Sequence, residues 1–200
     1  LITQEKDRNT LIQKACQILI ETRGYYNAWI VLIDEQGHYL TCSQAGLNSE
    51  FDQMRELLEN NKWTSCAKNA FKTEDLIVTE ETQQKCQDCP LAEHYGESGA
   101  YTIALIYKEY TYGLLSVSIP KKYIRDRQEH ELFYEVSGDI AFALHNIRIE
   151  ESRIRAEEEL QKSRNFLNYA LDGLSANIAL LDNKGEIVLV NRAWRDFAEQ

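Results

Sequence analysis

The chain of 200 residues is 44% hydrophobic and 27% charged, which excludes a disordered, collagen-like or disulfide-dense protein and predicts a globular one. Acidic residues outnumber basic ones by 32 to 22, and the net charge of −10 disfavours binding to nucleic acid or an anionic membrane, because both are themselves negative. The apolar runs are far shorter than the roughly 20 residues of a membrane span, and no secretory signal opens the chain. The five cysteines are an odd number. The sequence therefore predicts a cytoplasmic protein with unpaired thiols.

The start of the chain predicts a helix followed by a β-hairpin. Apolar residues recur at helical spacing over residues 3–23, and Gly24 is a natural stop for that helix. Residues 28–33 form an apolar run rich in β-branched side chains, which favours a strand. Turn-forming residues at 34–37 and an extended pattern at 39–45 complete the hairpin.

Short helices and a long loop are expected in the middle of the chain. We expect Ser49 to cap a helix that ends at Asn60. Residues 80–99 have few large apolar side chains, and loops of this length in a compact domain are usually functional or disordered. A second helix at 65–71, a short strand at 76–79 and two longer strands at 101–107 and 112–119, joined by a turn at 108–111, complete the region.

A long helix is predicted from about Asp126 onward. Isoleucine or phenylalanine recurs every seventh residue at Phe133, Ile140, Ile147 and Ile154, and a second series follows at Leu160, Leu167 and Leu174. The second series begins six residues after Ile154, which would disturb a coiled-coil seam at that point. A solvated single helix is one interpretation; it would expose Ile147, Ile154 and Leu160, so a homodimer through this helix is the favoured one.

The last part of the chain repeats a pattern from its beginning. Residues 178–185 (Ile-Ala-Leu-Leu-Asp-Asn-Lys-Gly) match residues 30–37 (Ile-Val-Leu-Ile-Asp-Glu-Gln-Gly) in their apolar run and their Asp-x-x-Gly turn. A strand at 186–190 follows the second copy. The sequence therefore predicts a second hairpin of similar design.

The order of these elements resembles a GAF domain, a small-molecule and redox sensing module of signalling proteins. Residues 29–37, 112–117 and 133–147 carry the resemblance, which is to a branch found in bacterial and archaeal sensor histidine kinases. That branch has a cysteine ahead of an alanine-rich helix and a later Cys-x-x-Cys-Pro-Leu, here Cys66 and residues 86–91. Residues 165–197 resemble the start of a PAS domain.

The resemblance implies an α+β fold with a GAF-like antiparallel sheet flanked by helices, a long C-terminal linker helix and a partial PAS-like segment. The expected organisation is a GAF domain at 1–149, a coiled-coil linker at 150–164 and the PAS-like segment at 165–200. The implied function is a sensory input module that detects a small ligand or redox state. It would relay the signal through a dimeric helix to PAS and kinase domains of a longer histidine kinase.

The cysteines are the candidate metal or redox site. Cys86 and Cys89 have a spacing that lets two thiolates bind one metal ion, Cys66 is a candidate third ligand, and Cys42 or His94 could complete a tetrahedral set. Zinc or an iron-sulfur cluster is one interpretation, and the resemblance adds haem held by a cysteine or histidine. A redox-active dithiol or disulfide, or reduced thiols that only pack the loop, are the others.

A ligand pocket is the second candidate site. In GAF folds the ligand lies between the sheet and the loops and short helices on one face. The resemblance implies lining by Trp63, Cys66, Phe71, Tyr95 and Tyr101. No nucleophile elbow, phosphate loop or dinucleotide fingerprint is present, so no enzyme activity is expected. The alternatives are a constitutive dimerisation module with structural cysteines, or a free-thiol enzyme resembling the methionine sulfoxide reductases built on this fold.

Overall fold

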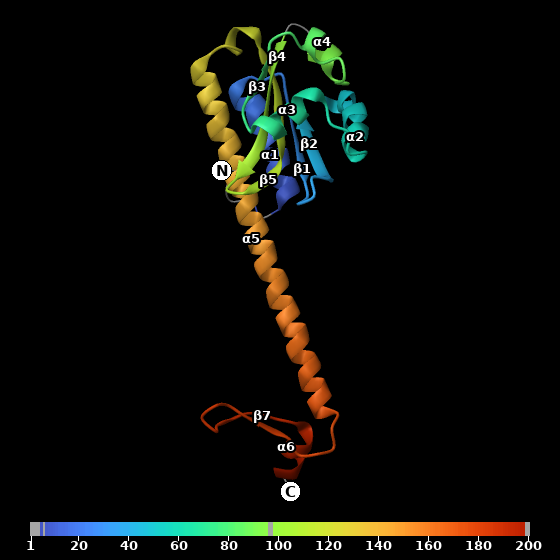
Figure 1. Ribbon diagram of the computed structural model, residues 1–200, viewed down its shortest axis with the longest axis vertical. Helices are drawn as coiled ribbons and strands as arrows, with labels where there is room; N and C mark the ends of the chain where they lie inside the picture. Colours follow the sequence, from blue (N-terminus) through green and yellow to red (C-terminus); the bar gives the residue numbers. More distant parts are fainter. Residues whose placement is uncertain (1–4, 6, 96–97, 199–200) are drawn as a thin grey trace. The chain divides into compact units, whose positions relative to one another are not determined.

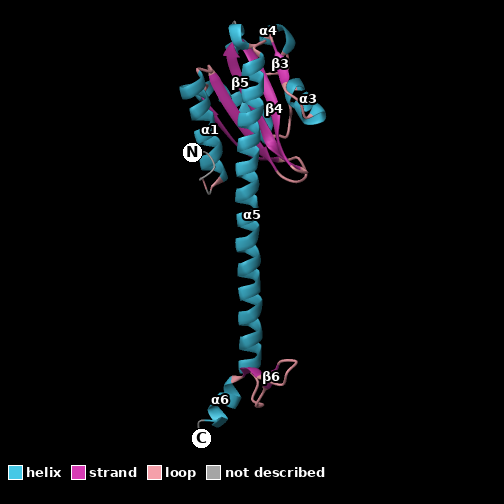
Figure 2. Cartoon of the chain, turned by 90° about the vertical axis from the view of Figure 1, so that its left-hand side faces the viewer, coloured by secondary structure: helices cyan, strands magenta, loops and turns pink. Residues whose placement is uncertain are grey.

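The computed structural model describes residues 5, 7–95 and 98–198. The chain forms two compact units, Leu1–Arg148 and Ile149–Gln200, which are described separately. The first unit contains a five-stranded sheet in the order β2-β1-β5-β4-β3, with helices on both faces (Figures 1 and 2). Every neighbouring pair of strands in this sheet is antiparallel.

The elements of the first unit follow the predicted order. The strands are β1 (Asn27–Ile33), β2 (Tyr39–Ala45), β3 (Ile77–Thr79), β4 (Ser98–Tyr107) and β5 (Tyr110–Pro120). The α-helices are α1 (Arg8–Arg23), α2 (Asp52–Glu59), α3 (Ser65–Thr73), α4 (Thr82–Lys85) and the first part of α5 (Arg127–Asp172). Short 3₁₀ helices are η2 (Asn48–Phe51), η3 (Ala92–Tyr95) and η4 (Lys121–Tyr123).

Local chemistry explains where the first helix and hairpin begin and end. The side chain of Asp7 accepts a hydrogen bond of 2.8 Å from the backbone N–H of Thr10 and caps α1. Gly24 ends the helix with φ of 66°, a left-handed conformation that glycine adopts without steric cost. In the β1–β2 turn the carboxylate of Asp34 accepts from the N–H groups of Gln36 and His38. The helix and the hairpin are therefore confirmed.

Two local predictions were wrong. Ser49 is not a cap, because it lies inside the 3₁₀ turn that leads into α2, and neither segment has a side-chain cap. The turn between β4 and β5 is also tighter than expected and consists of Lys108 and Glu109. Lys108 takes a φ of 55°, which lets the aromatic residues on either side, Tyr107 and Tyr110, pair across the hairpin.

Two hydrophobic cores lie on the two faces of the sheet. Side chains along a strand alternate between faces, so Ile30 and Leu32 enter the core beneath α1 and α5 (the first core), whereas Trp29 and Val31 enter the core beneath α2 and α3 (the second core). Figures 1 and 2 together show α5 on one side of the sheet and α2 on the other. Both faces of the central strands are thus covered.

The apolar stripe of α5 belongs in part to the first core. Phe133, Ile140 and Ile147 are at most 5% exposed and pack in the first core with the sheet of the same chain. The expectation that a single helix would expose Ile147 was therefore wrong, because its own domain covers that side chain. From Ile154 onward the apolar residues of the stripe are exposed: Ile154 by 43% and Leu160 by 71%.

The second unit contains the remainder of α5 with β6 (Ala179–Leu181), β7 (Ile187–Val190) and α6 (Arg192–Ala198). The strands pair antiparallel, and the carboxylate of Asp182 accepts from the N–H groups of Lys184 and Glu186, as Asp34 does in the first hairpin. The repeated hairpin is therefore confirmed.

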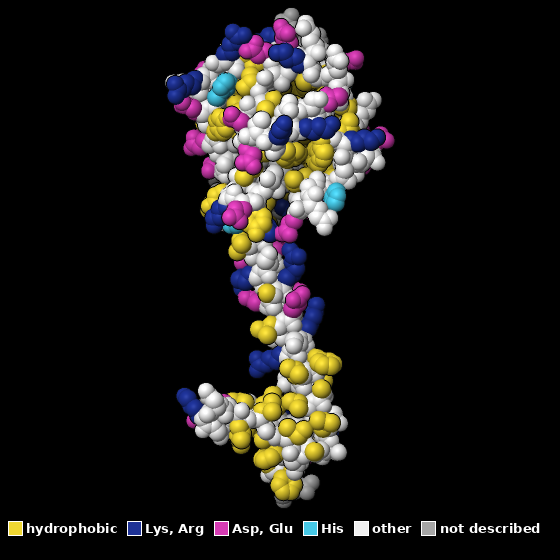
Figure 3. Space-filling model, in the orientation of Figure 1, with side chains coloured by type: hydrophobic (Ala, Val, Ile, Leu, Met, Phe, Trp, Pro, Cys, Tyr) yellow, Lys and Arg dark blue, Asp and Glu magenta, His cyan; other side chains and the backbone are white. Residues whose placement is uncertain are grey.

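Hydrophobic side chains are largely uncovered in this second unit. Figure 3 shows them gathered on its surface, and Leu181, Ile187 and Phe197 are each at least 59% exposed. No helix in the part of the chain that the structure describes is long and apolar enough to cross a membrane.

Candidate functional site

The loop that carries Cys86 and Cys89 is tied to the start of α3. The two cysteines bracket a turn in which the N–H of Cys89 donates to the carbonyl oxygen of Cys86 at 3.0 Å. Asp88, inside that turn, accepts from both the backbone N–H and the hydroxyl of Ser65 at 2.7 and 2.8 Å. Cys66 is the next residue of α3. The Asp88–Ser65 contact thus brings the loop to the helix turn that holds Cys66.

The thiols of the loop are protonated at neutral pH. Burial, with smaller contributions from Cys66 and Asp88, raises the pKa of Cys86 to about 11. Burial is likewise the main cause of the raised pKa of Cys89, which is about 12 with the smaller contributions of Cys66 and Cys86 included. Because thiolates, not thiols, attack electrophiles and bind metals, Cys86 and Cys89 are poor nucleophiles in this state.

Metal binding is not preformed at these residues. Among residues 5, 7–95 and 98–198, no three His, Cys, Asp or Glu side chains are grouped so that they could hold a metal ion. Cys42 lies on β2, with its sulfur 3.5 Å from the Tyr39 hydroxyl. His94 lies on η3, where its Nδ1 is 3.4 Å from a carboxylate oxygen of Glu50. A metal site would need the thiols to lose their protons and the loop to rearrange. Metal binding at these residues stays a prediction.

The five predicted lining residues lie on two faces of the sheet. Trp63, Phe71 and Tyr95 pack in or against the second core, and Trp63 and Phe71 have their ring centroids 5.3 Å apart. Tyr101 is on the opposite face: it belongs to the first core and its hydroxyl donates to the carbonyl oxygens of Tyr123 and Ile124. Cys66, on α3, is near Tyr95, whose pKa it helps to raise.

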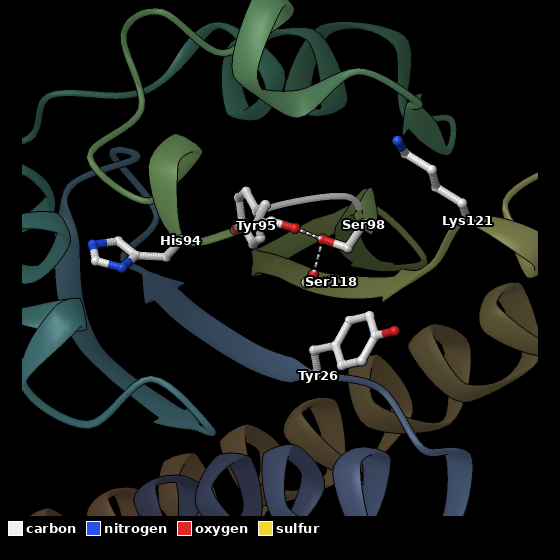
Figure 4. Close-up of a pocket in the computed structure, with 6 residues that line it drawn as sticks. All are labelled: Tyr26, His94, Tyr95, Ser98, Ser118 and Lys121. Atoms are coloured by element: carbon white, nitrogen blue, oxygen red, sulfur yellow. Dashed lines mark hydrogen bonds between the residues drawn. The ribbon is translucent and has the colours of Figure 1, made fainter.

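A pocket of about 450 Å³, called the hollow below, opens beside Tyr95. Its lining residues are Tyr26, His94, Tyr95, Ser98, Ser118 and Lys121 (Figure 4). Ser98 donates a hydrogen bond to the carbonyl oxygen of Tyr95, and its hydroxyl oxygen is 2.7 Å from that of Ser118. Of the residues singled out in the sequence, Tyr95 and His94 line the hollow.

Small hydroxyl residues line the second-core face of the central strands. Besides Ser98 and Ser118, this hydroxyl row contains Thr102 and Ser116, whose side-chain oxygens are 3.0 Å apart. All four are at most 4% exposed. The sequence signal is a hydroxyl at alternate positions of a strand, as in Ser116-Val-Ser118, and it becomes meaningful only once the strand order is known.

Two buried polar atoms near the hydroxyl row have no hydrogen-bond partner within the described chain. They are Oδ1 of Asn27, a residue that pairs with Ser118 in the sheet, and Nε1 of Trp29. The Trp29 N–H lies beside the Tyr95 hydroxyl without making a hydrogen bond of normal geometry. A buried polar group without a partner costs about 1–3 kcal/mol. Neither Asn27 nor Trp29 is among the residues that line the hollow.

Comparison with known proteins identifies the fold. No family model and no curated protein matches the chain. The GAF domain of the cyanobacteriochrome TePixJ is similar in structure, with a TM-score of 0.58 and 14% identity over 74% of this chain and 96% of that one. A domain named for a two-component sensor histidine kinase of Sinorhizobium meliloti 1021 gives 0.53 and 15%, over 72% and 95%.

An enzyme shares the same fold. Free methionine-R-sulfoxide reductase from Neisseria meningitidis has a TM-score of 0.54 and 11% identity, over 74% of this chain and 84% of that one. At such identities the similarity concerns the fold alone. The five-stranded antiparallel sheet with flanking helices is therefore GAF-like, which confirms the predicted fold class.

Proposed function

We propose that this GAF-fold chain is a sensory input module of a signalling protein, in which the first unit binds a small ligand and α5 passes on the change. The observation that carries the proposal is the hollow itself, which has a volume of about 450 Å³ and is lined in part by the buried hydroxyls of Ser98 and Ser118. Next to Ser118 in the sheet, Oδ1 of Asn27 is buried without a partner among the described residues, which costs stability. A ligand with a hydrogen-bond donor can bind to the hydroxyl oxygen of Ser118.

The strands that line the hollow also contact the output helix. Along β5, Ser118 faces the hollow, whereas its neighbours Val117 and Ile119 pack in the first core with Phe133 and Ile140 of α5. A shift of this strand on ligand binding would therefore move residues on both faces. The ligand can drive such a shift only to the extent that it binds the shifted and the unshifted strand arrangement with different affinity.

A cluster of aromatic and charged residues holds α5 where it reaches the end of the first unit. Nδ1 of His145 is 2.8 Å from the hydroxyl of Tyr112. The Arg148 guanidinium lies 3.7 Å from the centre of the Tyr110 ring and pairs with Glu35 at 2.5 Å. These contacts, named here the clasp, join α5 to the tips of both hairpins, so a movement of the strands would reach the helix.

The exposed part of α5 supports a homodimer as the form in which the signal is relayed. Ile154, Leu160, Leu167 and Leu174 are 43% to 71% exposed, and a second copy of the helix would cover them. The six-residue step between Ile154 and Leu160 is where the helix pair could change register. Downstream PAS and kinase domains and a cytoplasmic location belong to the same proposal, and free cysteines fit a reducing compartment.

Redox sensing is a second candidate, because the turn at Cys86 and Cys89 lies against the α3 turn that carries Cys66. A change at these sulfurs would disturb the Asp88–Ser65 contact and thus α3. The raised pKa values of Cys86 and Cys89 make reaction with oxidants slow, which favours ligand sensing and argues against a free-thiol enzyme.

A thermal-shift experiment tests the proposal. The whole chain is mixed with a low-molecular-weight metabolite fraction, and its unfolding temperature is compared with that of Ser118→Val, which fills part of the hollow, and Ser163→Val, an exposed control on α5. We expect the fraction to stabilise the wild type and Ser163→Val and to leave Ser118→Val unchanged. Equal shifts in all three proteins, or no shift in any, would contradict the proposal.

A further inference from the structure

The floor of the hollow offers hydrogen-bond acceptors. A carbonyl oxygen can only accept, so the single hydroxyl hydrogen of Ser98 is used by its bond to Tyr95 (Figure 4). The hydrogen in the 2.7 Å contact between Ser98 and Ser118 must then come from Ser118. Both hydroxyl hydrogens are thereby used within the protein, and among the described residues no group donates to the hydroxyl oxygen of Ser118, whose lone pairs can accept from a ligand.

Asn27 is a buried polar neighbour of Ser118. It is the direct partner of Ser118 across β1 and β5, and side chains that lie directly opposite each other in a sheet share a face. Asn27 is 4% exposed and its Oδ1 has no partner within the described residues. Asn27 is not among the residues that line the hollow, so the acceptor within reach of a ligand is the hydroxyl oxygen of Ser118. It calls for a ligand that brings a donor, such as a hydroxyl or an ammonium group.

One end of the hollow carries a positive charge, the ammonium group of Lys121. His94 and Lys121 lie at opposite ends of the lining residues in Figure 4. Among the described residues, no carboxylate forms an ion pair with Lys121, whereas His94 has Glu50 at 3.4 Å. An ammonium group without a carboxylate partner among the described residues, in a chain of net charge −10, attracts an anionic group to one place.

The walls and the volume limit the size of the ligand. The ring of Tyr95 is buried and forms one wall of the hollow. Tyr26, which is 59% exposed, forms the side that is open to solvent. The volume of about 450 Å³ falls within the roughly 300–1,000 Å³ range of small-molecule sites.

From this arrangement we infer that the hollow selects a small carboxylate that also carries a hydrogen-bond donor, the chemical class of hydroxy acids and amino acids. The carboxylate lies at Lys121, the donor reaches Ser118, and an apolar or aromatic body lies between Tyr26 and Tyr95. A phosphate ester fits less well, because its oxygens need several donors and the floor supplies acceptors. The inference rests on the proposed function, which places a ligand in this hollow.

Calorimetric titration of the whole chain with three matched probes tests the ligand class. The probes are 3-phenyllactate, which has both groups, 3-phenylpropanoate, which lacks the hydroxyl, and 3-phenyllactamide, which lacks the charge. We expect 3-phenyllactate to bind tightest, with about a tenfold loss for either missing group. Phenyl phosphate, as a fourth probe, should bind more weakly than 3-phenyllactate.

Four variants assign the two contacts. In Lys121→Gln, 3-phenyllactate and 3-phenyllactamide should bind equally, whereas the adjacent exposed control Lys122→Gln should keep the wild-type preference. In Ser118→Ala, 3-phenyllactate and 3-phenylpropanoate should converge, whereas Ser116→Ala, which removes a hydroxyl that does not line the hollow, should not change the order.

Several results would overturn the ligand class: equal binding of the three probes, no binding of any, tighter binding of phenyl phosphate, or an unchanged preference in Lys121→Gln. If the metabolite fraction still stabilises the chain in these cases, the sensory function stands without this ligand class. If 3-phenyllactate binds in the expected order and amide exchange in α5 does not change, the ligand class stands and the relay through α5 is wrong.

Discussion

Replacing Asp88 with alanine should loosen the cysteine loop from α3. The carboxylate makes two hydrogen bonds to Ser65, at 2.7 and 2.8 Å, and satisfies a backbone N–H at the start of the helix. Asp88 is itself exposed, so each bond contributes at the lower end of the usual range, and the pair together about 1.5 kcal/mol. For a domain of this size we expect the unfolding temperature to fall by about 3–6 °C.

The variant should also change the chemistry of Cys66. Release of the loop exposes the α3 turn, so alkylation of Cys66 by iodoacetamide, followed by peptide mass spectrometry, should become faster in Asp88→Ala. Asp88→Asn keeps one acceptor oxygen and should show about half of the loss in stability. Asp139→Ala, an exposed substitution on α5, is the control. Unfolding temperature and Cys66 alkylation equal to those of the control would refute the reasoning.

Three further predictions concern the clasp, the sheet and the exposed helix. Burial, with Lys108 and Arg148 nearby, lowers the pKa of His145 below its ordinary value of 6.5. The folded state then binds fewer protons than the unfolded state. The contribution of His145 to stability is therefore full above about pH 6.5 and falls as the pH drops toward the lowered pKa. Urea denaturation at several pH values should show this loss in the wild type and not in His145→Gln. Gly113→Ala places a Cβ 1.9 Å from the carbonyl oxygen of Val31, and should lower stability by about 2 kcal/mol or more in the same assay; a loss below half that value would show that β1 and β5 can move apart. Leu167→Asp should convert a dimer into a monomer in analytical ultracentrifugation, and an unchanged mass would exclude α5 as the dimer contact.

Local sequence signals predicted the first unit's elements well, because their causes are local. Gly24 stops α1, and Asp34 organises the first turn through its own neighbours. The same turn chemistry recurs at Asp182. The Ser49 cap failed because a capping serine must itself have a non-helical, usually extended backbone, and Ser49 lies within a 3₁₀ turn.

The candidate site depends on contacts between distant residues, which spacing alone does not reveal. Tyr101 faces the first core because of the register of β4, and a shift by one residue would have put it on the other face. The hydroxyl pair of Ser98 and Ser118 forms only because β4 and β5 are neighbours. The cysteine loop reaches Cys66 through Asp88, a residue that the spacing argument passed over.

Hydrogen exchange in α5 tests the central claim most directly. The whole chain is incubated in deuterated buffer with and without the metabolite fraction, and amide exchange is followed by mass spectrometry over residues 127–148, which pack on the sheet opposite the hollow. The account predicts changed protection in this segment together with protection of β5, and neither change in Ser118→Val. Protection of β5 with no change in α5 would contradict it, because ligand binding would then stop at the sheet.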